Sequence, residues 1–307
     1  MIEEIEEIVR RIEAKEIAGA DDTALASARA LAILAQHSEA KDAAEFRKEM
    51  EDISRRLVNA RPSSASLRNC ISHINRGVKA TGEIDLVNLR SLIEASASRF
   101  VEKIKEAKSI IGEIGSKRIK DGKVILTHGF STTVYAILKR VVEERKRVHV
   151  FVTEARPGLE GRQMAKMVGE LGLPVTLITD SAVRVFINEI DNVLTGAEAV
   201  AVNGAVISKV GTAVIAGLAH EARVRVLAAA GTYKLSPETV VGELVEIEEG
   251  AQTQVIDLDL LTKMKNVEVR NPLYDVTSPE YIDAIITERG VVPPQAAYLI
   301  LRQMMEG

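Results

Sequence analysis

KVILTHGFSTT, residues 123–133, joins a short apolar run to a polar loop and then to a segment of helical spacing. The apolar run at 124–126 predicts a buried parallel strand, and the spacing at 133–142 predicts a helix. A strand, a loop and a helix in this order place ligands at the carboxyl end of an open α/β sheet. Ser131 or Thr132 can cap this helix, and the N–H groups at its start suit a phosphate. Ser131 is therefore a candidate ligand residue, with plain helix capping as the alternative.

The composition indicates a soluble globular chain with room for two domains. Of its 307 residues, 46% are apolar and 27% are charged. The net charge of −4 gives no general attraction to nucleic acid or to an anionic membrane, and the absence of Trp argues against a base-stacking surface. Cys70 is the single cysteine, interpreted as an inert core thiol, so we expect no disulfide, no metal site and no cofactor. With no signal peptide or transmembrane run recognised, we expect a cytoplasmic protein.

Residues 1–121 predict an N-terminal α-helical domain, because apolar residues recur there at helical spacing. Asp21 or Asp22 is expected to cap the second helix, and Asp42 the third. The expected helices lie near residues 5–12, 22–36, 43–59, 66–77 and 86–119.

Residues 122–307 predict a Rossmann-like α/β domain, a doubly wound parallel sheet, because short apolar strands alternate there with helices. The expected strands are 124–126, 148–152, 175–178, 192–195, 199–202, 224–228 and 267–269. The expected helices are 133–142, 159–171, 181–188 and 210–222.

The central loop resembles that of the family uniting the alpha, beta and delta subunits of translation initiation factor 2B with aldose-phosphate isomerases. These enzymes include methylthioribose-1-phosphate isomerase and archaeal ribose-1,5-bisphosphate isomerase. In the enzymes a cysteine with an acid–base role follows Thr-His. The resemblance places Gly129 at that position, and a glycine has no side chain that could move a proton.

Two segments of the helical domain are similar to the same family. ARPSSASLRN at 60–69 resembles its Arg-Pro-Thr-Ala-Val-Asn segment, in which the planar fork of Arg61 could hold a phosphate. The alternative is that Arg61 pairs with a carboxylate. IAGA at 17–20 aligns with the enzymes' Arg-Gly-Ala loop, whose Arg is expected to contact the substrate phosphate. Here that position is Ala18, while Gly19 remains a candidate binding residue.

TEARPGLEGR at 153–162 resembles the family's Glu-Thr-Arg-Pro…Gln-Gly-Arg motif, with Ala155 and Glu160 departing from it. Arg156 leaves the carboxyl end of a predicted strand, where a ligand would bind. Arg156 is therefore a candidate ligand residue, and an ion pair with Glu154 is the alternative.

TGAEAVAVNGAVISKVGT at 195–212 is the longest match, and its family form begins Gly-Ala-Asp. The resemblance implies that this Asp is the second catalytic group of the enzymes. Glu198 occupies its position in this chain and carries the carboxylate one methylene further out. Asn203 and Lys209 match the family and are candidate ligand residues. Gly204 is interpreted as a turn residue.

The tail VRNPLYDVTSPEYIDAIITERGVVPP at 269–294 resembles the family's Asn-Pro-x-Phe-Asp-x-Thr-Pro ending. Asp275 and Thr277 are expected to be structural caps in a turn. His128 is interpreted as a satisfied structural residue.

The three losses at Ala18, Gly129 and Glu198 predict a non-catalytic member of the family, with Gly129 and Glu198 as vestigial catalytic positions. We therefore expect an alpha-type regulatory subunit without isomerase turnover, which binds paralogous subunits or initiation factor 2. Its pocket would sense a phosphorylated small molecule, either a sugar phosphate or a nucleoside monophosphate. The residues expected to bind this ligand are Gly19, Arg61, Ser131, Arg156, Asn203 and Lys209.

Two alternatives stay open. One is an aldose-phosphate isomerase of the ribose-1,5-bisphosphate type, acting through His128 with Glu198 or Asp180. The other is a paralogue that only assembles with an active isomerase. In each case the apolar tail after Pro294 predicts a homo-oligomer formed through the α/β domain.

Overall fold

A computed structural model describes residues 2–80 and 84–306, which form two compact units, 1–108 and 109–307. The division falls inside helix α5 (Leu86–Ser116). Each unit is described by itself. The domain assignment of 1–121 and 122–307 stays a prediction.

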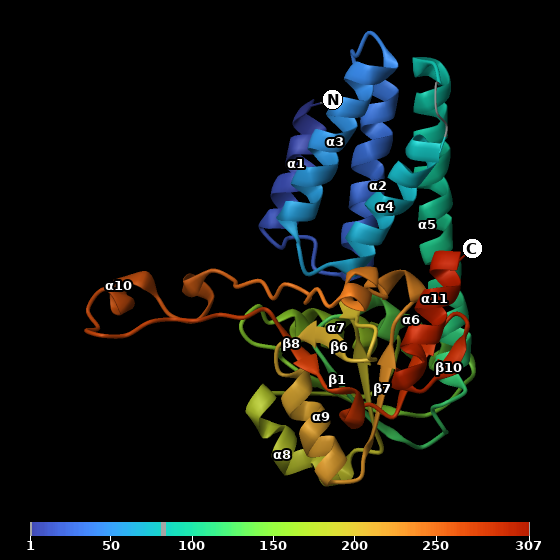
Figure 1. The fold of residues 1–307 in the computed structure, drawn as a ribbon. Helices are drawn as coiled ribbons and strands as arrows, with labels where there is room; N and C mark the ends of the chain where they lie inside the picture. The colour runs from blue at the N-terminus through green and yellow to red at the C-terminus, as the bar shows by residue number, and fades with distance from the viewer. Residues whose placement is uncertain (1, 81–83, 307) are drawn as a thin grey trace. The chain divides into compact units, whose positions relative to one another are not determined.

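The first unit is a helical bundle, as predicted from the apolar spacing, and it is drawn in blue to cyan in Figure 1. The Asp42 carboxylate caps α3 by accepting the Glu45 N–H at 2.8 Å. The expected cap of α2 is wrong: Gly19 occupies the N-cap position, and Asp21 and Asp22 lie in the first turn, where their charge favours the helix dipole. The helices of this unit besides α5 are α1 (Ile2–Glu13), α2 (Ala20–His37), α3 (Ala43–Ala60) and α4 (Ala65–Ala80).

The second unit contains a seven-stranded sheet of order β10-β9-β7-β4-β1-β2-β3, in which only the β9–β10 pair is antiparallel. The chain runs from β1 outward to β3 and then returns to β4 on the other side of β1. The carboxyl ends of β1 and β4 therefore mark the topological switch point, where ligands bind in such folds. The strands of this sheet are β1 (Val124–His128), β2 (His149–Thr153), β3 (Val175–Ile178), β4 (Asn192–Gly196), β7 (Arg225–Ala229), β9 (Ala284–Thr287) and β10 (Gly290–Val292).

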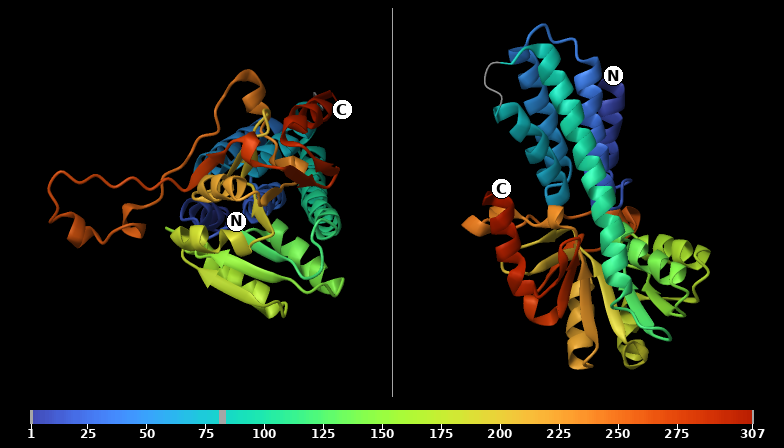
Figure 2. Two further views of the ribbon diagram at one scale, coloured as in Figure 1. Left: turned by 90° about the horizontal axis from the view of Figure 1, so that it is seen from below. Right: turned by 90° about the vertical axis from the view of Figure 1, so that its right-hand side faces the viewer.

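Helices cover both faces of this sheet, which confirms the doubly wound class (Figure 2). On one face, α6 (Thr132–Glu143) and α7 (Glu160–Glu170) pack against apolar residues such as Ile125 and Val150. On the other face, α8 (Val183–Phe186), the short helix η2 (Ile187–Glu189) and α9 (Thr212–Glu221) pack against residues such as Leu126.

A second, three-stranded antiparallel sheet lies beside the first in this unit, and the sequence did not predict two of its strands. The sheet consists of β5 (Ala199–Val200), β6 (Val206–Lys209) and β8 (Tyr274–Thr277). The predicted strand at 267–269 is wrong, because those residues are irregular and belong to an arm, residues 242–270, that carries α10 (Leu258–Leu261). Figure 1 shows this arm reaching away from the two sheets.

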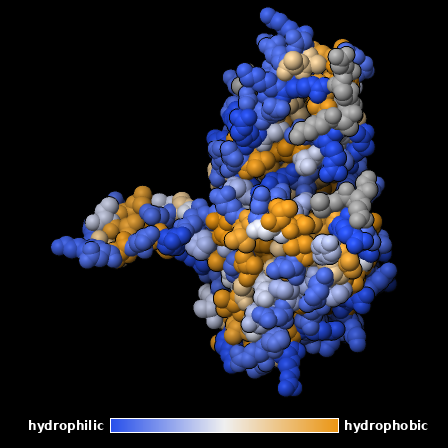
Figure 3. Space-filling view, viewed as in Figure 1, coloured by the Kyte–Doolittle hydropathy of each residue, from blue (hydrophilic) through white to orange (hydrophobic). Residues whose placement is uncertain are grey.

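Hydrophobic side chains are exposed along the arm, as the orange atoms of Figure 3 show. Leu244 in the arm has 93% of its surface exposed, whereas the chain's last helix, α11 (Ala297–Glu306), buries Ala297, Ile300 and Leu301 in a core cluster.

Across residues 2–80 and 84–306, no helix is long and apolar enough to cross a membrane.

The two glycines of α7 give a test of this packing. A Cβ on buried Gly161 would lie 1.8 Å from the Thr153 carbonyl oxygen, whereas a Cβ on exposed Gly169 would meet nothing within 4 Å. Gly161→Ala should therefore lower the free energy of unfolding by about 2–3 kcal/mol, because the helix must move away from β2. Gly169→Ala should raise it by up to about 1 kcal/mol through helix propensity.

Urea denaturation followed by circular dichroism measures both variants. Equal stabilities of the two variants would contradict the close packing of α7 on β2.

Candidate active site

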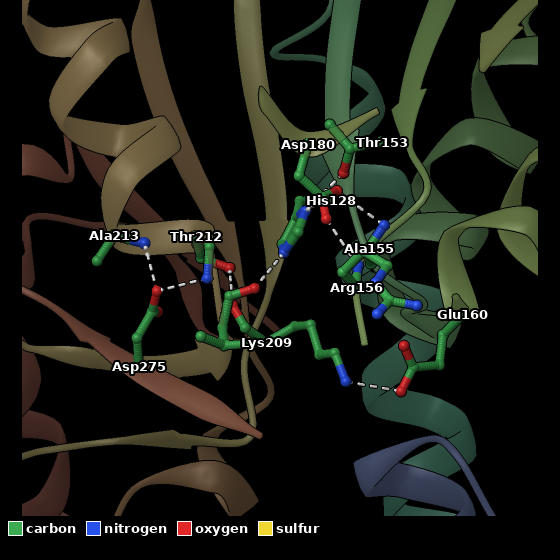
Figure 4. A network of polar contacts seen from close by, with 12 residues as sticks. His128, Thr153, Ala155, Arg156, Glu160, Asp180, Lys209, Thr212, Ala213 and Asp275 are labelled. Atoms are coloured by element: carbon green, nitrogen blue, oxygen red, sulfur yellow. Dashed lines mark hydrogen bonds and ion pairs between the residues drawn. The ribbon is translucent and has the colours of Figure 1, made fainter. Parts of the chain in front are cut away.

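The loops that leave β1, β2, β3 and β6 meet at the carboxyl edge of the parallel sheet (Figure 4). They bring together His128 and Gly129 after β1, the 154–160 loop after β2, Asp180 after β3, and Lys209 at the end of β6. The sheet topology predicts this meeting point.

His128 joins three of these segments. Its Nδ1 lies 2.5 Å from the Thr153 hydroxyl oxygen, and its Nε2 lies 2.8 Å from the Val210 carbonyl oxygen. Because a carbonyl only accepts, Nε2 carries the proton and Nδ1 accepts from Thr153. The ring is buried, and this desolvation lowers the pKa of His128. Both nitrogens are therefore committed to structural bonds, as the interpretation of His128 as a satisfied residue expects.

Asp180 fixes the loop that follows β2. Its carboxylate accepts the backbone N–H of Ala155 at 2.8 Å and that of Arg156 at 2.7 Å. This holds Ala155 in the left-handed region at a φ of 59°, which is uncommon outside glycine. The carboxylate oxygens of Asp180 are thus used to shape the loop.

Arg156 is exposed, and its Nη2 donates to the Gln254 carbonyl oxygen in the arm at 3.0 Å. The predicted alternative partner, Glu154, instead pairs with Arg162 at 2.9 Å. Arg156 therefore ties the loop after β2 to the arm, and its ligand role stays a prediction.

Gly129 has a φ of +71°, a conformation that side chains rarely adopt. A Cβ built there would lie 3.3 Å from both Cβ and Cγ of Lys209. The Lys209 side chain is 14% exposed and extends to Glu160, where Nζ donates to Oε1 at 2.8 Å. The candidate anion-binding lysine therefore already has a carboxylate partner.

Ser131 has the capping role given as its alternative, since its hydroxyl oxygen accepts the Val134 N–H at 3.2 Å. Asn203 lies in the turn between β5 and β6, where its side chain accepts the Ala205 N–H at 3.0 Å. The length of β6 separates this turn from Lys209, so the structure does not bring Asn203 and Lys209 together. Ligand binding by Ser131 and Asn203 stays a prediction.

Glu198 and Asp275 lie on either side of β6. Glu198 is 5% exposed and donates its N–H to the Ile207 carbonyl oxygen at 2.8 Å. Asp275 accepts the N–H groups of Gly211 and Ala213 at 2.7 and 3.1 Å, which caps α9 as expected. The expected turn is wrong, because Asp275 and Thr277 lie in β8, and the Thr277 hydroxyl has no hydrogen-bond partner among the described residues. Burial raises the pKa of the Asp275 carboxyl above its usual value.

In the helical unit, buried Arg61 organises the loop before α2. Its guanidinium donates to the carbonyl oxygens of Ile17 and Ala18 at 3.0 and 3.2 Å, and to the Thr23 hydroxyl at 2.8 Å. Gly19 is the N-cap of α2, and a Cβ there would lie 2.8 Å from Asp22 Oδ2. The predicted binding roles of Arg61 and Gly19 stay predictions.

Sequence reasoning missed one polar residue of the site. Glu160 was noted only as a departure from a motif, although its carboxylate accepts a hydrogen bond from Lys209. Within 2–80 and 84–306, no group of three or more metal-ligating side chains gathers.

The chain belongs to the Initiation factor 2 subunit family, whose sequence model matches residues 16–294. It is 44% identical over 306 residues to ribose 1,5-bisphosphate isomerase of Thermococcus kodakarensis, covering 99% of this chain and 95% of that one. It is 40% identical over 299 residues to the enzyme of the same name from Methanocaldococcus jannaschii, covering 97% and 94%. The solved structure of translation initiation factor eIF-2B from Pyrococcus horikoshii OT3 matches with a TM-score of 0.81 at 32% identity, covering 94% and 97%.

These relatives show that the prediction of a non-catalytic regulatory subunit is wrong, and so is the expectation that the chain is not an enzyme. Relatives at 40–44% identity over nearly the whole chain are named as isomerases. The prediction gave too much weight to Gly129 and Glu198. A missing cysteine removes one proton-carrying group, but the surrounding site still holds carboxylates, among them Glu160. Association with initiation factor 2 or paralogous subunits stays a prediction.

The buried imidazole predicts a pH dependence of stability. Folding lowers the pKa of His128, so below its ordinary value of 6.5 the unfolded chain binds a proton that the folded chain does not. Stability should then fall as pH drops through about 6.5, by up to about 1.4 kcal/mol per pH unit. His128→Gln removes this contribution, because an amide does not titrate.

Urea denaturation of both proteins between about pH 5 and pH 7.5 measures the difference. Asp180 and Glu160 oppose the lowering of the pKa, and Lys209 adds to it. If the stability of wild type and of His128→Gln changes with pH in the same way, folding does not shift the pKa of His128, and the prediction is wrong.

Proposed function

We propose that this chain is an aldose-phosphate isomerase whose substrate is ribose 1,5-bisphosphate. The observation that carries the proposal is the 44% identity to the Thermococcus kodakarensis enzyme of that name over 306 residues. The fold supports it, because the switch point between β1 and β4 is a ligand site by topology.

Conversion of a cyclic aldose 1-phosphate into a ketose moves one hydrogen from C2 to C1. A base removes the C2 proton, and the electrons of the C–H bond form a C1–C2 double bond. The bond between C1 and the ring oxygen breaks at the same time, and an acid protonates that oxygen. In the second half, the base returns its proton to C1, and the acid recovers one from the C2 hydroxyl, which becomes the carbonyl. Two proton-carrying groups complete this cycle without an oxidant or reductant.

Glu198 fits one of these two roles, because it stands at the position of the family's catalytic Asp in the resemblance above. The other two groups in the original alternative, His128 and Asp180, fit poorly, since their polar atoms hold Thr153, Val210 and the loop after β2. The cations of the α/β unit that suit the phosphates are Lys209 and Arg156.

An assay of the purified chain with ribose 1,5-bisphosphate tests this function. We expect ketose formation at roughly 1 s⁻¹ or faster, and a fall in kcat of about 10²–10⁴-fold for Glu198→Gln. Methylthioribose 1-phosphate serves as the comparison substrate and should react more slowly. Absence of ketose product from ribose 1,5-bisphosphate would contradict the proposal, whatever the result with methylthioribose 1-phosphate.

We also propose that a second copy of this chain covers the arm. The first motive for a homo-oligomer was the apolar tail, but Ala297 and Ile300 are buried in the chain's own core, and mainly Tyr298 and Leu299 remain exposed. The arm gives a stronger motive. Exposed apolar residues repeat along it and just before it, at Val240, Val241, Leu244, Val255, Leu258, Leu260, Met264 and Val267. Contiguous apolar surface of this kind marks interaction sites.

Light scattering tests the association. We expect the wild-type chain to run as a dimer or a higher even oligomer at micromolar concentration, and Leu244→Lys with Leu258→Lys to shift it towards the monomer. The matched control is Val87→Lys, which places the same charge on a 73% exposed residue of α5. A monomeric wild-type chain, or an unchanged mass in the arm variant, would contradict the role of the arm.

A further inference from the structure

We propose that Glu160 is the second proton-carrying group of the isomerisation, supplying the chemistry that Gly129 cannot. This inference rests on the proposed function. It assigns to Glu160 the base that moves the proton from C2 to C1, and it leaves the acid role to Glu198.

The first support is the path of the Lys209 side chain. Its Cβ and Cγ lie 3.3 Å from the Cβ position of Gly129, and its Nζ lies 2.8 Å from Glu160 Oε1. The side chain of Lys209 therefore runs from the bare backbone of Gly129 to the Glu160 carboxylate (Figure 4). The Glu160 carboxylate thus lies at the far end of the lysine whose stem packs against Gly129.

The second support is the state of the carboxylate. Oε1 of Glu160 accepts from Lys209, whereas Oε2 is buried and has no hydrogen-bond partner among the described residues. A buried acceptor without a hydrogen-bond partner lowers the stability of the folded chain. A role of this oxygen in catalysis would explain why the chain carries this cost. Oε2 is the atom placed to take up a proton.

The third support is the space made by Gly158. A Cβ on Gly158 would lie 2.4 Å from Glu160 Oε1 and 2.8 Å from Oε2. The carboxylate thus folds back over the Gly158 backbone, in a position that any other residue at 158 would block. The loop after β2 is built to hold this carboxylate beside Lys209.

The other carboxylates near Lys209 are committed elsewhere. Asp180 holds two backbone N–H groups, and Glu154 pairs with Arg162. Asp275 also has a buried oxygen without a hydrogen-bond partner among the described residues, but its other oxygen caps α9, on the side of Lys209 away from Glu160 (Figure 4).

The ion pair with Lys209 also suggests how the base is released. A substrate phosphate carries more charge than a carboxylate, so it competes for the Lys209 ammonium. Once the ammonium turns to the phosphate, Glu160 takes the C2 proton on Oε2, and it later delivers that proton to C1. The carboxylate ends the cycle as it began, so the proton count balances.

The test compares Glu160→Gln with wild type on ribose 1,5-bisphosphate. Gln keeps the shape and an oxygen for Lys209 but cannot take the proton, so kcat should fall at least about 100-fold. KM should stay the same or fall, because a neutral amide competes less with the phosphate for Lys209. The matched control is Glu170→Gln at the other end of α7. It makes the same change in an exposed pair with Lys166 and should leave kcat unchanged.

A second variant, Gly158→Ala, keeps Glu160 but pushes its carboxylate out of place, and it should also lower kcat. If Glu160→Gln does not fold, the kcat of Gly158→Ala tests the role of Glu160 instead, and a wild-type kcat would contradict that role. Wild-type turnover with kcat of Glu160→Gln within about threefold of wild type would overturn the role of Glu160 alone. No turnover by the wild-type chain would overturn the proposed function together with this role.

Discussion

The site depends on the way buried His128 bonds to two neighbouring segments. Through Thr153 it fixes the end of β1 to the end of β2, and through the Val210 carbonyl it fixes β1 to the turn between β6 and α9. These bonds need a neutral ring that carries its proton on Nε2. Burial favours the neutral form, and the Val210 carbonyl selects this tautomer. Gly129 is the next residue in the chain, and its positive φ turns the backbone towards α6. The side chain of Lys209 packs close to Gly129 at this turn. His128 thus fixes the strand ends next to Gly129 and Lys209, while Asp180 shapes the loop after β2.

Much of the fold could be predicted from local sequence. Asp42 and Ser131 cap their helices because a short polar side chain before an apolar periodic segment reaches the N–H groups of its own helix. The strand at 175–178 stands where its apolar run predicts it. By contrast, both β6 and β8 were missed: no strand was expected at 206–209, and a helix was expected from residue 210. Their pairing joins residues far apart in sequence, and local spacing does not report such pairs.

The candidate site was less predictable, for the same physical reason. Topology brings Gly129, Asp180 and Lys209 to one edge, and the motifs pointed to those loops. The partner of Lys209 is Glu160, 49 residues earlier in the chain, and its carboxylate is held by a tertiary contact. A motif comparison shows which residue is missing, but it does not show which nearby group can take over its role. The structure places the Glu160 carboxylate 2.8 Å from the Lys209 ammonium, and we propose that this carboxylate is such a group.

The proposed reaction moves a proton between C2 and C1 of ribose 1,5-bisphosphate. The most direct measurement follows the reaction in heavy water by proton nuclear magnetic resonance. We expect loss of the C2 proton signal and formation of a ketose whose C1 carries either the proton taken from C2 or deuterium that the carboxylate has gained from the solvent. An aldose that keeps its C2 proton throughout, with no ketose formed, would contradict the proposed isomerisation.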